Sequence, residues 1–114
     1  MLTDELEQIR KYKSTKTIDE ESKVIKVLIL KHSTRCSLSS TVINRLERNW
    51  QATGTEKIKP YYLDLLAHRD ISNEIAGRYK VRHESPQVLL IENEICIYNK
   101  SHLDIIYNEI MKCV

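Results

Sequence analysis

The sequence predicts an α/β protein with a mixed four-stranded sheet flanked by helices. Residues 24–30 form a short apolar run rich in β-branched residues, as expected of a strand buried on both faces. The residues after it carry apolar side chains at three- and four-residue steps, which is helical spacing. Near the C-terminus, two short apolar runs lie at hairpin distance. The 114 residues are expected to form one domain, residues 1–114.

The chain is predicted to begin with an extra N-terminal helix. Thr3 is a suitable N-cap, apolar side chains follow at helical steps, and the helix is expected to end near Tyr12. The polar residues 13–23 are then predicted to form a loop. Residues 24–30 follow as the first core strand. The apolar residues of the helix are Leu2, Leu6 and Ile9.

A strand-helix-strand unit comes next. The helix is predicted to start at Ser37 and to end before Gly54, with Trp50 on its buried face as a core residue. Residues 58–65 form the second predicted strand. Pro60 lacks an N–H donor, which places the opening of this strand at an edge or an irregular position. Such a unit implies two parallel strands joined by a right-handed crossover.

The C-terminal half is predicted to contain a helix, a hairpin and a last helix. Asp70 is a suitable N-cap for the first helix, which ends near Lys80. The apolar residues 87–91 and 95–98 flank a polar turn and are expected to pair antiparallel. Ser101 is predicted to cap the last, amphipathic helix. The resulting order, α-β-α-β-α-β-β-α, is that of the thioredoxin fold.

Composition and charge exclude several classes of function. The formal net charge is only +2 and 30% of the residues are charged, so no strongly basic nucleic-acid surface is expected. No apolar run approaches the roughly 20 residues needed to cross a bilayer, and the N-terminus lacks the pattern of a secretory signal. We expect a cytoplasmic monomer without nucleic-acid or membrane partners.

The cysteines and histidines do not form a disulfide or metal pattern. Cys36, Cys96 and Cys113 are an odd set with unequal gaps, and no histidine lies at zinc-finger spacing from them. We therefore predict no metal site and at least one free thiol. Cys96, in a predicted strand, is interpreted as a core residue. Cys113 is expected to be an exposed thiol near the terminus, and a resolving or intermolecular role for it stays open.

Cys36 lies where the first core strand gives way to the next helix. Helix N-termini present unpaired N–H groups and a partial positive charge, which stabilise a thiolate. Arg35 adds positive charge beside the thiol, and Ser39, one helical turn later, can donate a hydrogen bond to the thiolate. We interpret Cys36 as a reactive thiol rather than a small buried side chain.

A second motif, Ser85-Pro86, precedes the third core strand. In a fold of this order, the start of that strand and the Cys36 junction can meet at one end of the sheet. Proline has no N–H to donate. If its peptide bond is cis, the backbone of the preceding residue can face the thiol and pair with an extended substrate.

Other polar residues have competing interpretations. His32, four residues before Cys36, could contact the substrate or tune the thiol by its charge, or it could be a solvated loop residue. His68 and His83 are assigned structural or surface roles. A basic group could steer an anionic ligand, but a solvated basic face is preferred. This group consists of Arg78, Lys80 and Arg82.

Three segments of the chain carry specific sequence motifs. They are LKHSTRCSLS at residues 30–39, YYLDLLAHR at residues 61–69 and VRHESPQ at residues 81–87. Together they resemble the monothiol bacilliredoxins, thioredoxin-fold proteins of the bacillithiol redox system in low-GC Gram-positive bacteria. The resemblance covers nearly the whole chain. The family usually has proline directly after the cysteine, where this chain has Ser37, a difference expected to affect thiol reactivity.

The resemblance implies that Cys36 removes bacillithiol from mixed disulfides on client proteins, with bacillithiol as co-substrate and no tightly bound cofactor. Because Ser39 stands where dithiol enzymes have a resolving cysteine, a second bacillithiol is expected to release the adduct, with Cys113 or another protein as alternatives. The predicted supporting residues are Arg35, Ser37 and Ser39. The predicted substrate-binding residues are His32, Thr34, Ser85 and Pro86.

Two other kinds of function stay open. One is a reductase that uses another low-molecular-weight thiol, such as a monothiol glutaredoxin-like protein, or a related carrier of an iron-sulfur cluster. The other is a non-catalytic adaptor that holds a peptide in the groove beside Ser85-Pro86.

Overall fold

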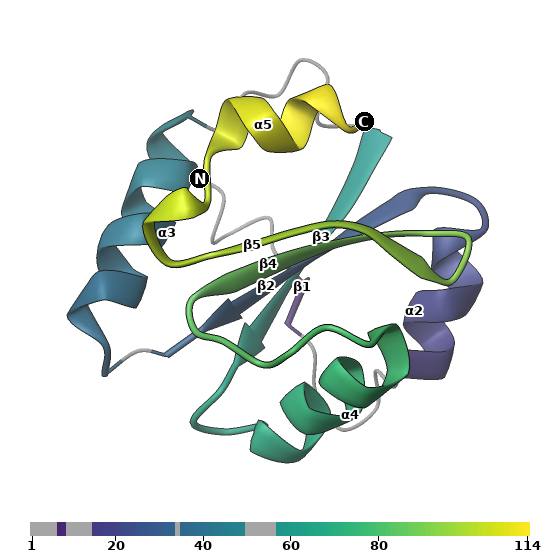
Figure 1. Ribbon diagram of the computed structural model, residues 1–114, viewed down its shortest axis with the longest axis horizontal. Helices are drawn as coiled ribbons and strands as arrows, with labels where there is room; N and C mark the ends of the chain where they lie inside the picture. Colours follow the sequence, from purple (N-terminus) through teal and green to yellow (C-terminus); the bar gives the residue numbers. More distant parts are fainter. Residues whose placement is uncertain (1–6, 9–14, 34, 50–56) are drawn as a thin grey trace.

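A five-stranded mixed sheet, ordered β1-β3-β2-β4-β5, organises the chain (Figure 1). The computed structural model describes residues 7–8, 15–33, 35–49 and 57–114. The strands are β1 (Glu7–Gln8), β2 (Lys26–His32), β3 (Ile58–Asp64), β4 (Gln87–Glu92) and β5 (Ile95–Ser101). The helices are α2 (Thr15–Ser22), α3 (Ser37–Asn49), α4 (Arg69–Tyr79), α5 (Tyr107–Lys112) and the 3-10 turn η2 (His102–Asp104). None of the helices in these ranges is long and apolar enough to span a membrane.

The pairing of the strands confirms the predicted mixed sheet flanked by helices. Strand β2 pairs in parallel with β3, and α3 forms the crossover between them. On its other side β2 pairs antiparallel with β4, which continues into β5 through a tight hairpin. Asn93 and Glu94 form this turn with positive φ angles of 49° and 68°, the backbone that two-residue hairpins favour. The short strand β1 adds a fifth member beside β3.

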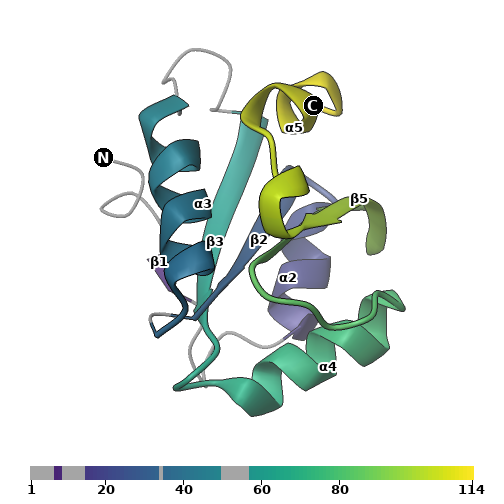
Figure 2. The ribbon, with the colours of Figure 1, turned by 60° about the vertical axis from the view of Figure 1, so that its left-hand side comes forward.

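Two helical layers cover the sheet, with α3 and α5 on one face and α2 and α4 on the other (Figures 1 and 2). Strands β2 and β4 are almost completely buried because both of their faces are covered. Their side chains alternate between the layers, as the period of a strand requires. Leu28 and Leu30 therefore pack in the α3 layer, while Val27 and Ile29 pack in the α2–α4 layer.

The N-terminal prediction is wrong where the structure describes it. Within the predicted helix over residues 2–12, Glu7–Gln8 form β1, which pairs in parallel with β3, and the rest of that helix lies outside the described residues. A helix instead occupies Thr15–Ser22, where a loop was predicted. Ile18 is the only strongly apolar residue in this helix, and its other buried residues are polar, so the apolar spacing did not reveal it.

Other helix ends also differ from the predictions. His68, not Asp70, occupies the N-cap of α4, and Asp70 lies in the first turn. Ser101 precedes η2 without capping it, because its hydroxyl donates to Glu84 instead. The predicted last helix is divided into η2 and α5 by the extended Ile105 and Ile106.

The predicted position of Pro60 agrees with the structure. Pro60 is opposite Leu28 of β2, and among the described residues β1 pairs with Tyr61 and Tyr62, beyond the opening of β3. Gly54 and Trp50 lie outside the described residues.

Candidate active site

Cys36 immediately precedes α3 and is partly exposed. Its N–H donates to the carbonyl of Ser33 at 3.1 Å, which closes a turn after β2. Its own carbonyl accepts the N–H of Ser40 at 3.1 Å, which is the first bond of the helix. Cys36 is therefore the N-cap residue of a 13-residue helix, where unpaired N–H groups and the helix dipole favour a thiolate.

Ser39 connects α3 to the strand that precedes Cys36. Its fully buried hydroxyl lies 2.5 Å from Nδ1 of His32 and accepts the N–H of Ser33 at 3.1 Å. With the imidazole protonated on Nε2, the Ser39 hydroxyl donates to Nδ1. The structure contains no hydrogen bond between Ser39 and Cys36, so the predicted donation to the thiolate is replaced by this contact with His32.

His32 is only 7% exposed, so the alternative of a solvated loop histidine is wrong. Its ring lies 5.5 Å from the ring of Tyr62 between centroids, in a tilted arrangement. Burial lowers the pKa of His32, and the nearby carboxylate of Asp64 opposes this shift. The imidazole is thus kept neutral in the folded protein, as its role as an acceptor for Ser39 requires.

The Ser85-Pro86 peptide bond is cis, the isomer that the sequence left open. Hydrogen bonds hold this segment on both sides. The buried side chain of Gln87 donates to the carbonyl of Arg82 at 2.9 Å, and Ser101 donates to Glu84 at 2.6 Å. The buried hydroxyl oxygen of Ser85 has no hydrogen-bond partner in the described residues.

The sheet brings this segment to the same end as the Cys36 junction. Lys31, the penultimate residue of β2, is opposite Gln87, the first residue of β4. The chain therefore leaves β2 toward Cys36 at the end of the sheet where it enters β4 from Pro86. This is the juxtaposition expected from the order of the elements.

Sequence reasoning missed a polar cluster at this end of the sheet. Lys31 is fully buried on the α4 face of β2, and its Nζ lies 3.4 Å from both the carbonyl of Ser72 and Nδ1 of His83. The Ser72 hydroxyl lies 3.0 Å from the same Nδ1. The signal available in the sequence was Lys31, a charged residue directly after the apolar residues 24–30.

The remaining predicted site residues are placed less specifically. Arg35 and Ser37 are exposed beside Cys36, and Thr34 lies outside the described residues. Cys96 is half-buried and packs against the α2–α4 layer, so it lies at the margin of the core and not within it, and burial raises the pKa of its thiol. Cys113 is partly buried against the α3–α5 layer, so it is not the fully exposed thiol that was predicted.

The basic residues at the end of α4 and after it, Arg78, Lys80 and Arg82, are exposed, as a solvated basic face requires. Arg78 also forms an ion pair with the buried Asp19. His68 occupies the N-cap position of α4, and its side chain forms no capping hydrogen bond. No group of histidine, cysteine and acidic side chains suited to a metal ion occurs in the ranges that the structure describes.

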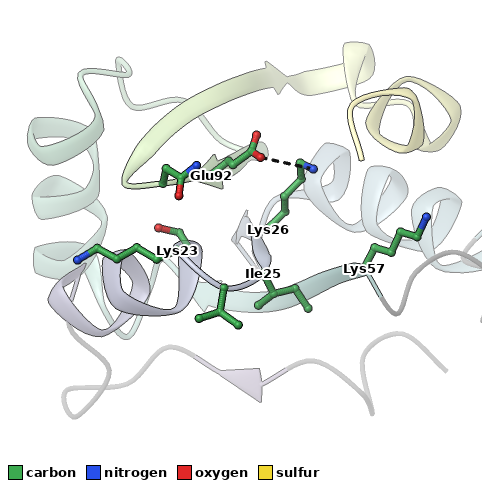
Figure 3. A pocket seen from close by; sticks show the side chains of 8 residues that line it. Lys23, Ile25, Lys26, Lys57 and Glu92 are labelled. Carbon is green, nitrogen blue, oxygen red and sulfur yellow. Dashed lines mark ion pairs between the residues drawn. The ribbon is translucent and has the colours of Figure 1, made fainter.

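A cavity of about 280 Å³ lies at the opposite end of β2 (Figure 3). It is lined by Lys23, Lys26 and Lys57, and the ammonium of Lys26 pairs with Glu92 at 3.7 Å. Lys26 begins β2 and Glu92 ends β4, so the cavity is separated from Cys36 by the length of the central strands. It does not belong to the thiol site.

Comparisons with known proteins agree with this geometry. A family model described as "Monothiol bacilliredoxin BrxC" matches residues 7–110. A solved structure of a candidate oxidoreductase with a thioredoxin fold is 26% identical, with a TM-score of 0.78 over 96% of this chain and 94% of that chain. Malassezia sympodialis thioredoxin (Mala s 13) is 16% identical, with a TM-score of 0.68 over 95% and 86%. Chlamydomonas reinhardtii thioredoxin f2 is 10% identical, with a TM-score of 0.64 over 95% and 92%. The last two support the fold alone.

Proposed function

The chain belongs to the monothiol bacilliredoxin family, and on that premise we propose that Cys36 removes bacillithiol from client proteins. The family and the fold make it a thiol-disulfide oxidoreductase. The observation that carries the assignment to a residue is the position of Cys36, partly exposed at the N-cap of α3. The sulfur there is accessible to a disulfide at the N-terminal end of the helix.

The proposed reaction is two successive thiol-disulfide exchanges. The Cys36 thiolate attacks the bacillithiol sulfur of the mixed disulfide, so a new S–S bond forms and the old one breaks. The electron pair of the broken bond leaves on the sulfur of the client protein, which takes up a proton. A second thiolate then attacks the adduct and releases Cys36, and the oxidised product is a disulfide that contains bacillithiol.

We propose that the second thiolate is another bacillithiol molecule, used as a co-substrate without a tightly bound cofactor. Ser39 occupies the position of a Cys-x-x-Cys resolving thiol, and it is fully buried in its contact with His32. It offers no sulfur for an internal disulfide. The other two cysteines lie in different helical layers, Cys96 against α2–α4 and Cys113 against α3–α5.

The client's backbone is proposed to lie along the Ser85-Pro86 segment. Two features support this assignment: the segment enters β4 at the end of the sheet that leads to Cys36, and the Ser85 hydroxyl oxygen is unpartnered. Arg35 and Ser37, both exposed, would border the same approach, with Thr34 between His32 and Cys36 in the chain.

The test is the release of bacillithiol from a bacillithiolated protein in the presence of bacillithiol. Cys36→Ala is expected to abolish catalysed release, because the nucleophile is lost, while the matched control Cys96→Ala retains it. Release by Cys36→Ala at the native rate would contradict the assignment. Equal turnover with glutathione and glutathionylated protein would favour a general reductase, and loss of release in Cys113→Ala would identify Cys113 as the resolving thiol.

A further inference from the structure

In the buried polar cluster of Lys31, Ser72 and His83, Lys31 contacts both of the other residues. Its ammonium reaches from β2 to the Ser72 carbonyl of α4 and to Nδ1 of His83, each at 3.4 Å. The Ser72 hydroxyl lies 3.0 Å from that same nitrogen. With the ring protonated on Nε2, Nδ1 of His83 is the acceptor for the Lys31 ammonium, and the Ser72 hydroxyl shares the same lone pair.

The charges around His83 favour this arrangement at neutral pH. Lys31 faces it from β2, Arg69 from the first turn of α4, and Glu84 from its own segment. Burial, Lys31 and Arg69 lower the pKa of His83, while Glu84 opposes them. Burial and Arg69 lower the pKa of Lys31 to about 8, so it is mostly charged at pH 7. His83 is therefore a neutral acceptor beside a charged donor.

This cluster is adjacent to the segment proposed to bind the client. His83 precedes Ser85 by two residues, and Lys31 is opposite Gln87 in the β2–β4 pairing. The contact of Glu84 with Ser101 holds the segment to β5, and the contact of Gln87 with the carbonyl of Arg82 lies within the segment. Among the side chains of the described residues, only Lys31 and Ser72 hydrogen-bond the His83 ring and so connect it to β2 and α4.

We propose that Lys31 is a positioning residue for thiol exchange: by donating to His83, it holds the Ser85-Pro86 segment against the end of β2 that leads to Cys36. The proposal rests on the function proposed above and adds a residue to it. It also implies pH dependence. A protonated His83 has no free acceptor at Nδ1 and adds a positive charge beside Lys31 and Arg69, so acid breaks the contact and loosens the segment.

The first test separates docking of the client from reactivity of the thiol. In Lys31→Met, kcat/KM for a bacillithiolated protein should fall about tenfold, mainly through KM, because an ordered contact to a charged group is lost. Alkylation of Cys36 by iodoacetamide should change less than about twofold. The control is Lys26→Met, at the half-buried start of the same strand and at the opposite end of the sheet from Cys36, which should leave both rates unchanged. If Lys31→Met slows both reactions equally or neither, the proposal is overturned.

A second variant tests the role of His83 without removing the lysine. His83→Asn keeps an acceptor for Lys31 but cannot be protonated near neutral pH. At each pH, the rate of bacillithiol release is divided by the rate of Cys36 alkylation. This ratio should fall below about pH 6.5 in the native chain but not in His83→Asn, which should retain the native release rate at pH 7.5. An identical acid fall in His83→Asn would contradict the proposal.

Amide hydrogen exchange provides a readout that does not depend on the substrate. Exchange at residues 82–85 should be faster in Lys31→Met than in the native chain and in Lys26→Met, because the segment loses its contact with β2. Unchanged exchange would overturn the positioning role. If the native chain releases no bacillithiol but Lys31→Met exchanges faster, the proposed function fails while the positioning role stands.

Discussion

Ser39 joins the helix that follows Cys36 to the strand that precedes it. Its buried hydroxyl contacts both Nδ1 of His32 and the N–H of Ser33. The serine that replaces a resolving cysteine therefore has a structural role of its own. It fixes the turn in which the carbonyl of Ser33 accepts the N–H of Cys36.

Ser39→Ala is expected to lower the free energy of unfolding by about 1–3 kcal/mol, because it leaves buried polar groups of His32 and Ser33 without a partner. Urea denaturation measures this loss. Ser40→Ala is the matched control, since the adjacent Ser40 side chain forms no hydrogen bond in the described structure, and it should change stability by less than about 0.5 kcal/mol. Equal effects of the two substitutions would contradict the assigned contact.

The stability of the protein is expected to fall as the pH drops below about 6.5. Burial lowers the pKa of His32, and the carboxylate of Asp64 opposes this shift. Burial and the positive charges of Lys31 and Arg69 lower the pKa of His83, and Glu84 opposes this shift. The unfolded chain then binds more protons than the folded chain as pH drops below about 6.5. The two neutral histidines thus make their full contribution to the free energy of unfolding above about pH 6.5, and this contribution is lost in acid.

Urea denaturation at a series of pH values measures this effect. Replacing His32 by glutamine should reduce the slope between pH 6.5 and 5, because one of the two titrating groups is removed. A native stability that is constant or increases over this interval would show that the two histidines are not kept neutral by the fold.

At the scale of elements, α2 is attached to α4 through polar contacts. Asp19 is buried, accepts the hydroxyl of Tyr79 at 2.7 Å and forms an ion pair with Arg78. Burial and the hydrogen bond from its hydroxyl to Asp19 raise the pKa of Tyr79 far above its usual value. Thr15 of α2 also donates to Glu74 of α4 at 2.6 Å.

Asp19→Ala is therefore expected to destabilise the protein by about 1–3 kcal/mol, because the buried Tyr79 hydroxyl loses its acceptor. Thermal and urea denaturation measure the change. Glu20→Ala, at the next position of α2, removes only an exposed ion pair with Lys23 and should cost less than about 1 kcal/mol. If Asp19→Ala is as mild as Glu20→Ala, the polar contact between the helices is not what holds α2.

The same contacts explain which elements the sequence could predict. Strands β2, β4 and β5, the hairpin turn and helix α3 follow from local patterns, because their apolar spacing and turn residues state the structure directly. Helix α2 buries the polar residues Thr15, Asp19 and Ser22 and only one strongly apolar residue, Ile18. Their partners lie as far away as Glu74 and Tyr79, so no local pattern could identify this helix.

The whole molecule depends on the two central strands, which pack against helices on both faces. Ile29 in β2 is completely buried, while Ile97 on the edge strand β5 is 44% exposed. Ile29→Ala is expected to lower the free energy of unfolding by about 2–5 kcal/mol, through lost burial and the cavity that it leaves. Ile97→Ala should stay within about 0.5 kcal/mol of the native chain. Similar losses in urea denaturation would contradict the layered core.

The site was predictable to a similar extent. The motifs around Cys36 and Ser85-Pro86, with the order of the elements, predicted that the two segments meet at one end of the sheet. The links between them depend on contacts across layers: His32 with Ser39, and Lys31 with Ser72 and His83. Which face of β2 each of these polar residues occupies becomes clear only when the helices are in place.

The proposed mechanism requires that Cys36 itself carries bacillithiol during exchange. The most direct measurement mixes the chain with a bacillithiolated client protein in the absence of free bacillithiol, stops the reaction with acid and locates the adduct by peptide mass spectrometry. One bacillithiol on Cys36 is expected for each client thiol released. An adduct on Cys96 or Cys113, or release of the client without any adduct on Cys36, would contradict it.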